Sequence, residues 1–205
     1  MPPPAIHNVL LDRDGTIIEE GRYPADPEGV VLVPGGGESL GCLARAGLRL
    51  FCVTNQSGIG RGYYAEADFR AVQDRLERLL LPFGAVLVET AFCPHAPGDN
   101  CTCRKPATGL FDALDARHGL DPAATAVVGD AASDIAFGLA CGAALTILVM
   151  TGHGARSVAE LGLPQLAGDV LELACRKPGW PHVLARDLPA AAAYILDVVR
   201  NGKKP

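Results

Sequence analysis

The sequence predicts an α/β fold, a doubly wound parallel sheet with helices on both of its faces. Short apolar, β-branched runs alternate along the chain with segments whose apolar residues recur every three or four positions. Polar residues follow several of the apolar runs directly, at the strand ends where open parallel sheets bind ligands. Because alternating strands and helices are joined by right-handed crossovers, we expect one sheet and a single domain over 1–205.

Each expected strand is a short run rich in apolar, often β-branched residues, which is typical of buried strands. These runs lie at 6–11, 48–53, 86–89, 126–128 and 145–149. The segments between them have the apolar spacing of amphipathic helices. The predicted helices lie at 38–46, 66–81, 110–118 and 133–140.

The C-terminal part adds one more unit, a strand at 182–185 followed by a closing helix at 187–199. Between 159 and 179 the Leu-rich pieces are broken repeatedly by Gly and Pro. This segment is therefore predicted to be an irregular insertion.

Composition indicates one soluble globular domain and argues against nucleic acid or a membrane as a partner. Of the 205 residues, 49% are hydrophobic and 20% charged, and 24 Gly and 16 Pro without periodicity indicate many turns. The net charge is −5, with no basic run beyond Lys203-Lys204, so nucleic acid is not an expected partner. No apolar run approaches the roughly 20 residues of a membrane helix, and the N-terminus lacks the features of a signal peptide. We expect a cytoplasmic monomer.

Acidic residues follow two of the expected strands. The first strand leads into DRDGT at 12–16, and the fourth into Gly129 and Asp130. We expect the chain to leave the strand between Asp12 and Asp14, so that both carboxylates converge, with Asp130 at a neighbouring strand end. Such an all-oxygen site suits the hard cation Mg²⁺. Singly, each acid could equally be a solvated loop residue or a helix N-cap, but the three together favour the metal.

The second strand leads into Thr54 and the segment Asn55-Gln56-Ser57-Gly58-Ile59-Gly60. A hydroxyl, two amides and flexible main-chain N–H groups just before a helix can hold a phosphate group. Lys105 could bring a positive charge to the same oxygens, although a loop lysine is ordinarily a solvated surface charge.

Three cysteines and a histidine crowd into 93–103 in the pattern CxH, five residues, CxC. Cys93, His95, Cys101 and Cys103 suit a tetrahedral, structural Zn²⁺, with free cysteines beside a stray histidine as the alternative. The metal would close a loop poor in apolar residues that leads directly into Arg104 and Lys105. The other four cysteines lie in apolar surroundings and are expected in the core: Cys42, Cys52, Cys141 and Cys175.

The motifs together resemble those of the haloacid dehalogenase (HAD) superfamily of phosphotransferases: DRDGT at 12–16, Thr54, Lys105 and GDxxxD at 129–134. The resemblance implies a HAD-like fold in which Asp12 is the nucleophile and Asp14 the general acid and base. Thr54 and Lys105 would then bind the transferring phosphoryl group. Mg²⁺ would be held by Asp12, the main-chain carbonyl of Asp14 and Asp130, with support from Asp134.

Within that superfamily the zinc loop resembles two families of capless phosphatases, those for heptose bisphosphate and for histidinol phosphate. The run TNQSGIGRG at 54–62 is similar to the heptose family. This resemblance implies a small phosphorylated sugar as the substrate and removal of the C7 phosphate of D-glycero-D-manno-heptose 1,7-bisphosphate, a step towards nucleotide-activated heptose for lipopolysaccharide. The expected substrate-binding residues are Asn55, Gln56, Ser57, Arg61 and Arg104.

The two arginines also make chemical sense, because guanidinium groups can bind the second phosphate in a bidentate manner. The alternatives are a histidinol-phosphate phosphatase, a broader sugar-phosphate phosphatase, and a phospho-accepting or zinc-organised binding module without turnover. The second acid of the DxD motif favours turnover over the binding module.

Overall fold

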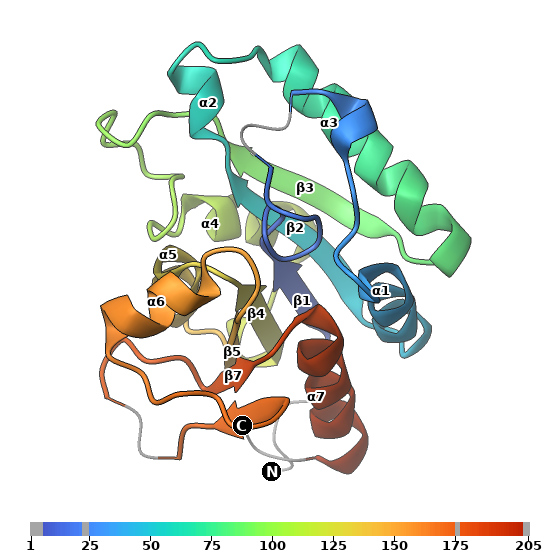
Figure 1. Cartoon of the computed structure of the whole chain (residues 1–205), viewed down its shortest axis with the longest axis vertical. Helices are drawn as coiled ribbons and strands as arrows, with labels where there is room; N and C mark the ends of the chain where they lie inside the picture. Colours follow the sequence, from blue (N-terminus) through green and yellow to red (C-terminus); the bar gives the residue numbers. More distant parts are fainter. Residues whose placement is uncertain (1–5, 22–24, 175–176, 203–205) are drawn as a thin grey trace.

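The computed structural model describes residues 6–21, 25–174 and 177–202, and within them seven strands form one sheet in the order β3-β2-β1-β4-β5-β7-β6 (Figure 1). All neighbouring pairs are parallel except β6 with β7. The prediction of a doubly wound parallel sheet is confirmed, with the antiparallel edge strand β6 as the exception. The strands are β1 (Asn8–Leu11), β2 (Arg49–Asn55), β3 (Leu87–Cys93), β4 (Thr125–Gly129), β5 (Leu145–Val149), β6 (Val170–Glu172) and β7 (Val183–Ala185).

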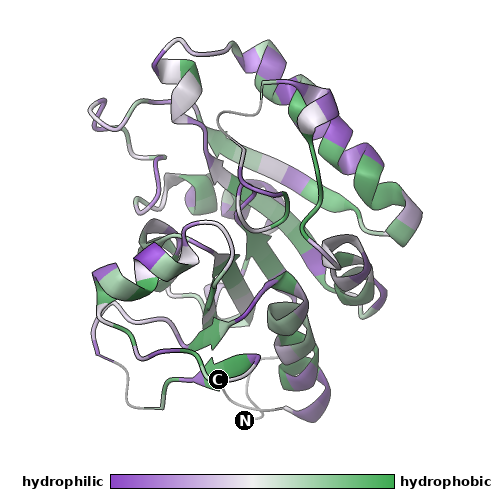
Figure 2. Ribbon diagram, in the orientation of Figure 1, coloured by the Kyte–Doolittle hydropathy of each residue, from purple (hydrophilic) through white to green (hydrophobic). Residues whose placement is uncertain are grey.

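Helices cover both faces of the sheet (Figure 1). One face carries α1 (Gly36–Arg45), α3 (Glu66–Leu80) and α7 (Leu188–Asn201), and the other carries α4 (Gly109–His118), α5 (Ala132–Ala140) and α6 (Gly154–Leu161). Figure 2 shows the apolar strands at the centre and hydrophilic residues along the outward side of α3. No helix in the described ranges is both long and apolar enough to cross a membrane.

Successive residues of the central strands contribute to different cores. Val9 and Leu11 of β1 pack in the core under α1, α3 and α7, whereas Leu10 packs in the core under α4 and α5. All four residues of β1 are buried. This two-sided burial explains why the strands read as continuous apolar runs rather than as an alternating pattern.

Capping residues define both ends of the closing helix, α7. The Asp187 side chain accepts a hydrogen bond from the main-chain N–H of Ala190, which caps the N-terminus of α7, and Pro189 occupies its first turn. Gly202, in the left-handed conformation, ends the helix.

The segment 159–179, predicted to be irregular, contains regular structure. The end of α6 reaches Leu161, and β6 forms an antiparallel edge strand against β7. The end of α6 was missed because the helix is only eight residues long and stops at the Gly162 break, and β6 was missed because it is three residues long. A strand of three residues such as β6 can be identified from its pairing with β7 but not from its own sequence.

One cysteine prediction is wrong. Cys42 is exposed, because the buried positions of α1 include Leu40, Gly41 and Leu43, which leaves Cys42 on the outward side of the helix. Cys52 is buried in the core as expected, and Cys141 packs partly buried against the core under α4 and α5. Cys175 lies outside the described residues.

Candidate active site

A cavity of about 520 Å³ lies beyond the carboxyl ends of β1, β2 and β4. These three strands are adjacent in the sheet, so the residues that follow them meet at one edge, as the sequence predicted. Arg61 is exposed directly after the short helix α2 (Ser57–Gly60) and is not among the lining residues. The other predicted catalytic, substrate-binding and magnesium residues line the cavity: Asp12, Asp14, Thr54, Asn55, Gln56, Ser57, Arg104, Lys105, Asp130 and Asp134.

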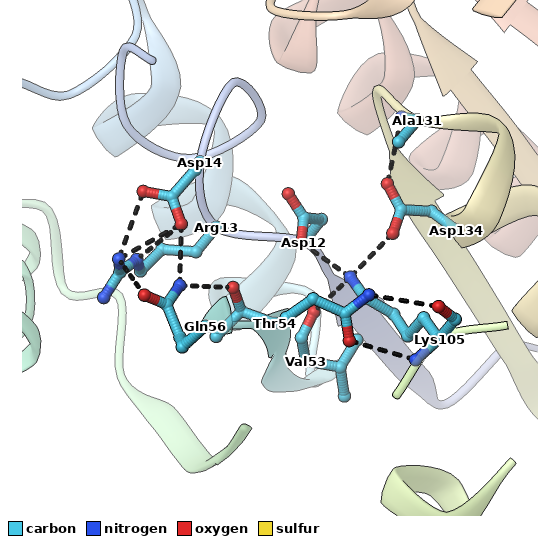
Figure 3. Close-up of polar contacts among 10 residues, drawn as sticks. Asp12, Arg13, Asp14, Val53, Thr54, Gln56, Lys105, Ala131 and Asp134 are labelled. Atoms are coloured by element: carbon cyan, nitrogen blue, oxygen red, sulfur yellow. Dashed lines mark hydrogen bonds and ion pairs between the residues drawn. The ribbon is translucent and has the colours of Figure 1, made fainter. Parts of the chain in front are cut away.

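A buried ammonium group joins two carboxylates at the floor of the cavity (Figure 3). Lys105 Nζ lies 2.6 Å from Asp12 Oδ1 and 2.6 Å from Asp134 Oδ1, and it donates a third hydrogen bond of 2.7 Å to the Val53 carbonyl. Burial acts to lower the pKa of Lys105, but the two carboxylates outweigh it and raise the pKa above its ordinary value. Lys105 is therefore a fixed positive charge beside Asp12.

The carboxylate of Asp12 is in an unfavourable environment for its charge. Burial raises its pKa well above the usual range, Lys105 opposes this, and the nearby carboxylates of Asp134 and Asp130 raise it further. Burial and the charge of Asp134 also raise the pKa of Asp130 to about 7, against a hydrogen bond of 2.6 Å from the His153 main-chain N–H. The single positive charge of Lys105 therefore does not balance the negative charges that the carboxylates of Asp12, Asp130 and Asp134 can carry.

The donor set fits a hard divalent cation. One oxygen from each of Asp12, Asp130 and Asp134 lies within 4.8 Å of the others, and a cation among them would offset their mutual repulsion. The residues around Asp130 leave no spare room: a Cβ on Gly15 would lie 2.3 Å, and one on Gly152 2.1 Å, from Asp130 Oδ2. Both glycines also have positive φ, which an L side chain rarely adopts.

The expected convergence of Asp12 and Asp14 is wrong for their side chains. The Asp14 carboxylate turns towards Arg13 and Gln56 (Figure 3), and Asp134 takes the third place in the acidic cluster. The chain turns sharply after Asp12, where the main-chain N–H of Gly15 donates to Ile18. Asp134 also stabilises the start of α5 from its third position, because its Oδ2 accepts from the N–H of the N-cap residue Ala131 at 3.0 Å.

The last two residues of β2, Thr54 and Asn55, form hydrogen bonds with other residues of the site. Asn55 Oδ1 accepts from the Lys105 N–H at 3.0 Å, and its amide donates to the Lys105 carbonyl at 3.1 Å, so Asn55 holds the main chain of Lys105. Thr54 Oγ1 accepts a hydrogen bond of 2.8 Å from the amide of Gln56. The Thr54 hydroxyl and the Lys105 ammonium thus border the cavity together.

The four predicted zinc ligands lie together as expected. Cys103 Sγ lies 3.2 Å from Cys93 Sγ, 3.6 Å from Cys101 Sγ and 3.3 Å from His95 Nδ1. A tetrahedral zinc site has ligand-to-ligand edges of about 3.5–3.8 Å, whereas a disulfide bond is about 2 Å long. The cluster therefore fits a closed, four-ligand metal site, and the cysteines in it are free thiols.

The segment 93–103 is also bonded to the loop after β2. The main-chain N–H of Gln56 donates to the Cys93 carbonyl at 2.8 Å, and that of Gly60 donates to the Pro94 carbonyl at 2.7 Å. A Cβ on Gly60 would lie 2.6 Å from the main chain of Ala96, so only glycine fits this approach.

Several residues of the site escaped the sequence analysis. Glu20, Tyr64 and His153 line the cavity, and His153 Nε2 pairs with Glu20 Oε1 at 2.9 Å across its rim. Arg13 is buried beside Asp14. Only Arg13, inside the DRDGT motif, had a sequence signal, because the other three come from loops that the tertiary fold brings together.

The sequence of this chain matches one family model and is similar to several known proteins. The HAD-hydrolase-like family model matches residues 102–172. The D-glycero-beta-D-manno-heptose-1,7-bisphosphate 7-phosphatase of Bordetella bronchiseptica is 34% identical over 158 residues, which cover 77% of this chain and 88% of that protein. The protein of the same name from Pseudomonas putida is 37% identical over 158 residues, covering 77% of this chain and 89% of the relative.

Solved structures agree with these matches. The crystal structure of D,D-heptose 1,7-bisphosphate phosphatase from B. bronchiseptica, complexed with magnesium and phosphate, superposes with a TM-score of 0.80 at 30% identity. The alignment covers 94% of this chain and 99% of that one. The corresponding enzyme from Burkholderia thailandensis gives a TM-score of 0.65 at 31% identity, over 92% and 97% of the two chains.

Proposed function

Because this chain belongs to the D-glycero-D-manno-heptose-1,7-bisphosphate 7-phosphatase family of HAD-like hydrolases, we propose that it removes the C7 phosphate of that sugar bisphosphate. The observation that carries the proposal is the pairing of Asp12 with Lys105 at the floor of a cavity that Asp14 and Thr54 also line. A carboxylate nucleophile, a second acid and phosphate-binding groups then face one substrate. We place the reaction in the cytoplasm, in a single-domain monomer. The free thiols of the described cysteines fit a reducing compartment.

In the first step the Asp12 carboxylate attacks phosphorus and the bond from phosphorus to the sugar oxygen breaks. The leaving oxygen keeps the electron pair and takes a proton from Asp14, which gives the sugar alcohol and an aspartyl-phosphate. Lys105 and Thr54 bind the oxygens of the transferring group, where charge must be stabilised.

In the second step a water molecule attacks the aspartyl-phosphate while Asp14, now a carboxylate, accepts its proton. The bond from phosphorus to the Asp12 oxygen breaks, which restores Asp12 and releases inorganic phosphate. The proton that Asp14 gives in the first step is thus regained in the second, and one water is consumed per turnover.

Asp12, Asp130 and Asp134 present the carboxylates that would hold Mg²⁺, together with the main-chain carbonyl of Asp14 as a proposed ligand. When bound, the cation supplies positive charge to the phosphoryl oxygens and to the crowded carboxylates. Zn²⁺, held by the four ligands in 93–103, would serve a structural role by fixing the segment that leads into Arg104 and Lys105.

The second phosphate of the substrate needs a cation at the rim of the cavity. Arg104 is half-buried there, and its Nη1 is buried without a hydrogen-bond partner among the described residues. We propose Arg104 as a binding group for this phosphate, together with Ser57, which lies at the start of α2 and also lines the cavity. Arg61 is exposed and lies outside the cavity lining, so it is less well placed than Arg104 to bind this phosphate.

Steady-state kinetics on three compounds test this function: D-glycero-D-manno-heptose 1,7-bisphosphate, the corresponding 1-phosphate and histidinol phosphate. We expect kcat/KM for the bisphosphate to exceed that for histidinol phosphate by at least about 10²-fold, on the scale of one or two charge-assisted contacts. The 1-phosphate should accumulate as the product. In Asp12→Asn, which keeps the shape and removes the nucleophilic charge, turnover should stop while the thermal transition is retained. Equal efficiencies on the two substrates would contradict the assignment of substrate.

A further inference from the structure

Arg13 is a fully buried cation next to the proposed acid and base. Its side chain is 0% exposed and lies 5.0 Å from the centre of the Phe69 ring. Its Nη1 has no hydrogen-bond partner among the described residues. A buried charge with an unsatisfied donor lowers stability, and an apolar side chain of similar volume is often better tolerated. A contribution to stability therefore does not explain why an arginine, rather than an apolar residue, occupies this buried position.

The remaining nitrogens of Arg13 hold two acceptors in fixed directions (Figure 3). Nε and Nη2 donate to Oδ2 and Oδ1 of Asp14, both at 3.1 Å, and Nη2 also donates to Gln56 Oε1 at 3.1 Å. The planar guanidinium group thus fixes the plane of the Asp14 carboxylate, which a lysine ammonium could not do.

The same contact fixes the orientation of the Gln56 amide. Arg13 can only donate, and the Tyr64 hydroxyl donates to Gln56 Oε1 at 2.7 Å, so the oxygen of the amide must face these two groups. The Nε2 group consequently faces Thr54 Oγ1 and Asp14 Oδ2, each at 2.8 Å. The hydrogen-bonding capacity of the amide is fully used.

This orientation determines what the Thr54 hydroxyl can do. Its oxygen accepts from Gln56, so its own hydrogen must point away from that amide. Thr54 is buried and lines the cavity, where the acceptors are the oxygens of a bound phosphoryl group. The buried charge of Arg13 therefore sets the direction of a hydrogen-bond donor to which it is not itself bonded.

We propose that Arg13 is a positioning residue for the reaction: it aligns Asp14 for proton transfer and, through Gln56, directs the Thr54 hydroxyl towards the phosphoryl group. The inference rests on the proposed function, in which Asp14 protonates the leaving oxygen. It assigns no contact between Arg13 and the substrate.

Leaving groups of different basicity test the role of Arg13. An alkyl phosphate needs a proton on its leaving oxygen, whereas 4-nitrophenyl phosphate does not, and kcat/KM reports the first chemical step without the hydrolysis of the aspartyl-phosphate. In Arg13→Lys we expect kcat/KM for the alkyl phosphate to fall by about 10²-fold or more and that for 4-nitrophenyl phosphate to fall at least tenfold less. Arg13→Met should show the same separation and is the fallback if the lysine variant does not fold.

The matched control is Arg49→Lys. Arg49 also donates to an amide oxygen, of Asn8, and lies over an aromatic ring, of Phe51, but it follows α1 at the opposite end of the sheet from the cavity. This variant should leave both substrates unchanged. Gln56→Met, which keeps the pairing of Arg13 with Asp14, should weaken competitive inhibition by inorganic phosphate about fivefold, on the scale of one hydrogen bond.

Asp14→Asn separates failure of this inference from failure of the proposed function. If Asp14→Asn itself shows no difference between the two substrates, the acid role of Asp14 is wrong, and the role of Arg13 is wrong with it. If Asp14→Asn shows the difference but folded Arg13→Lys and Arg13→Met lose activity equally on both substrates, or lose none, only the positioning role is overturned.

Discussion

Lys105 Nζ lies 2.6 Å from Asp12 Oδ1, and the same nitrogen is bonded to Asp134 at an equal distance. Lys105 lies two residues after the segment 93–103 and Asp12 follows β1, so this contact joins parts of the chain 93 residues apart. One ammonium group consequently neutralises two buried carboxylates, and in the proposed function it would also bind the phosphoryl group.

Lys105→Met should therefore affect stability as well as activity. Removal of one partner from a buried ion pair costs about 3–5 kcal/mol, and here it leaves the carboxylates of Asp12 and Asp134 together. Urea denaturation at neutral pH without added metal should show that loss, and Mg²⁺ should restore part of it. Lys177→Met, which removes an exposed lysine over the Trp180 ring, should cost less than about 1 kcal/mol. Activity of Lys105→Met within threefold of the parent would show that Lys105 does not bind the phosphoryl group.

Cys101→Ser should release zinc. Elemental analysis after gel filtration should find about one zinc per chain in the parent protein and much less in the variant, with a parallel loss of phosphatase activity. Cys42→Ser is the control, because Cys42 is an exposed thiol on α1, and it should keep both zinc and activity. A zinc-free parent protein with full activity would contradict the ligand assignment.

Arg104→Ala should reduce kcat/KM for the sugar bisphosphate by about 10–10²-fold, the scale of a charge-assisted hydrogen bond lost from a binding site. The effect on a small monophosphate should be several times weaker, because that substrate lacks the second anionic group. Arg61→Ala tests the other predicted arginine, and its exposed position outside the cavity lining predicts a change of less than about threefold. A larger loss of kcat/KM in Arg61→Ala than in Arg104→Ala would show that Arg61, not Arg104, binds the second phosphate.

Gly152→Ala should weaken Mg²⁺ binding. The new Cβ would lie 2.1 Å from Asp130 Oδ2 and force that carboxylate to move, which should raise the Mg²⁺ concentration for half-maximal activity at least about tenfold. Gly47→Ala separates this effect from backbone strain, because Gly47 also has a positive φ but its Cβ would meet nothing within 4 Å. The control should lose stability and keep its Mg²⁺ dependence. Equal Mg²⁺ dependence in the two variants would argue against Asp130 as a ligand.

The sequence predicted the central strands and the residues at their ends because both depend on local pattern. A strand buried on two faces is apolar at nearly every position, as Val9 and Leu10 show by packing in different cores. The clustering of three cysteines with His95 was predictable for the same reason, since their spacing is short and typical of zinc sites.

Features that depend on long-range geometry were not predictable. The direction of the Asp14 carboxylate is set by a turn after Asp12 and by Gln56, 42 residues away. Arg13 would ordinarily be placed on the surface, since arginine is seldom fully buried. The strand β6 exists through its pairing with β7 rather than through its own three residues.

In the segment 93–103 four side-chain atoms that could hold a metal ion lie together and a few main-chain hydrogen bonds are formed, while residues 97–100 are exposed. A metal ion held by these atoms would be a cross-link that tolerates sequence change better than a packed core does, because the residues between the ligands would contribute little to folding. Related chains can therefore diverge in this loop, which leads into Arg104 in the cavity lining, while the strand ends that line the same cavity remain unchanged. In such a fold the choice of substrate can evolve separately from the reaction.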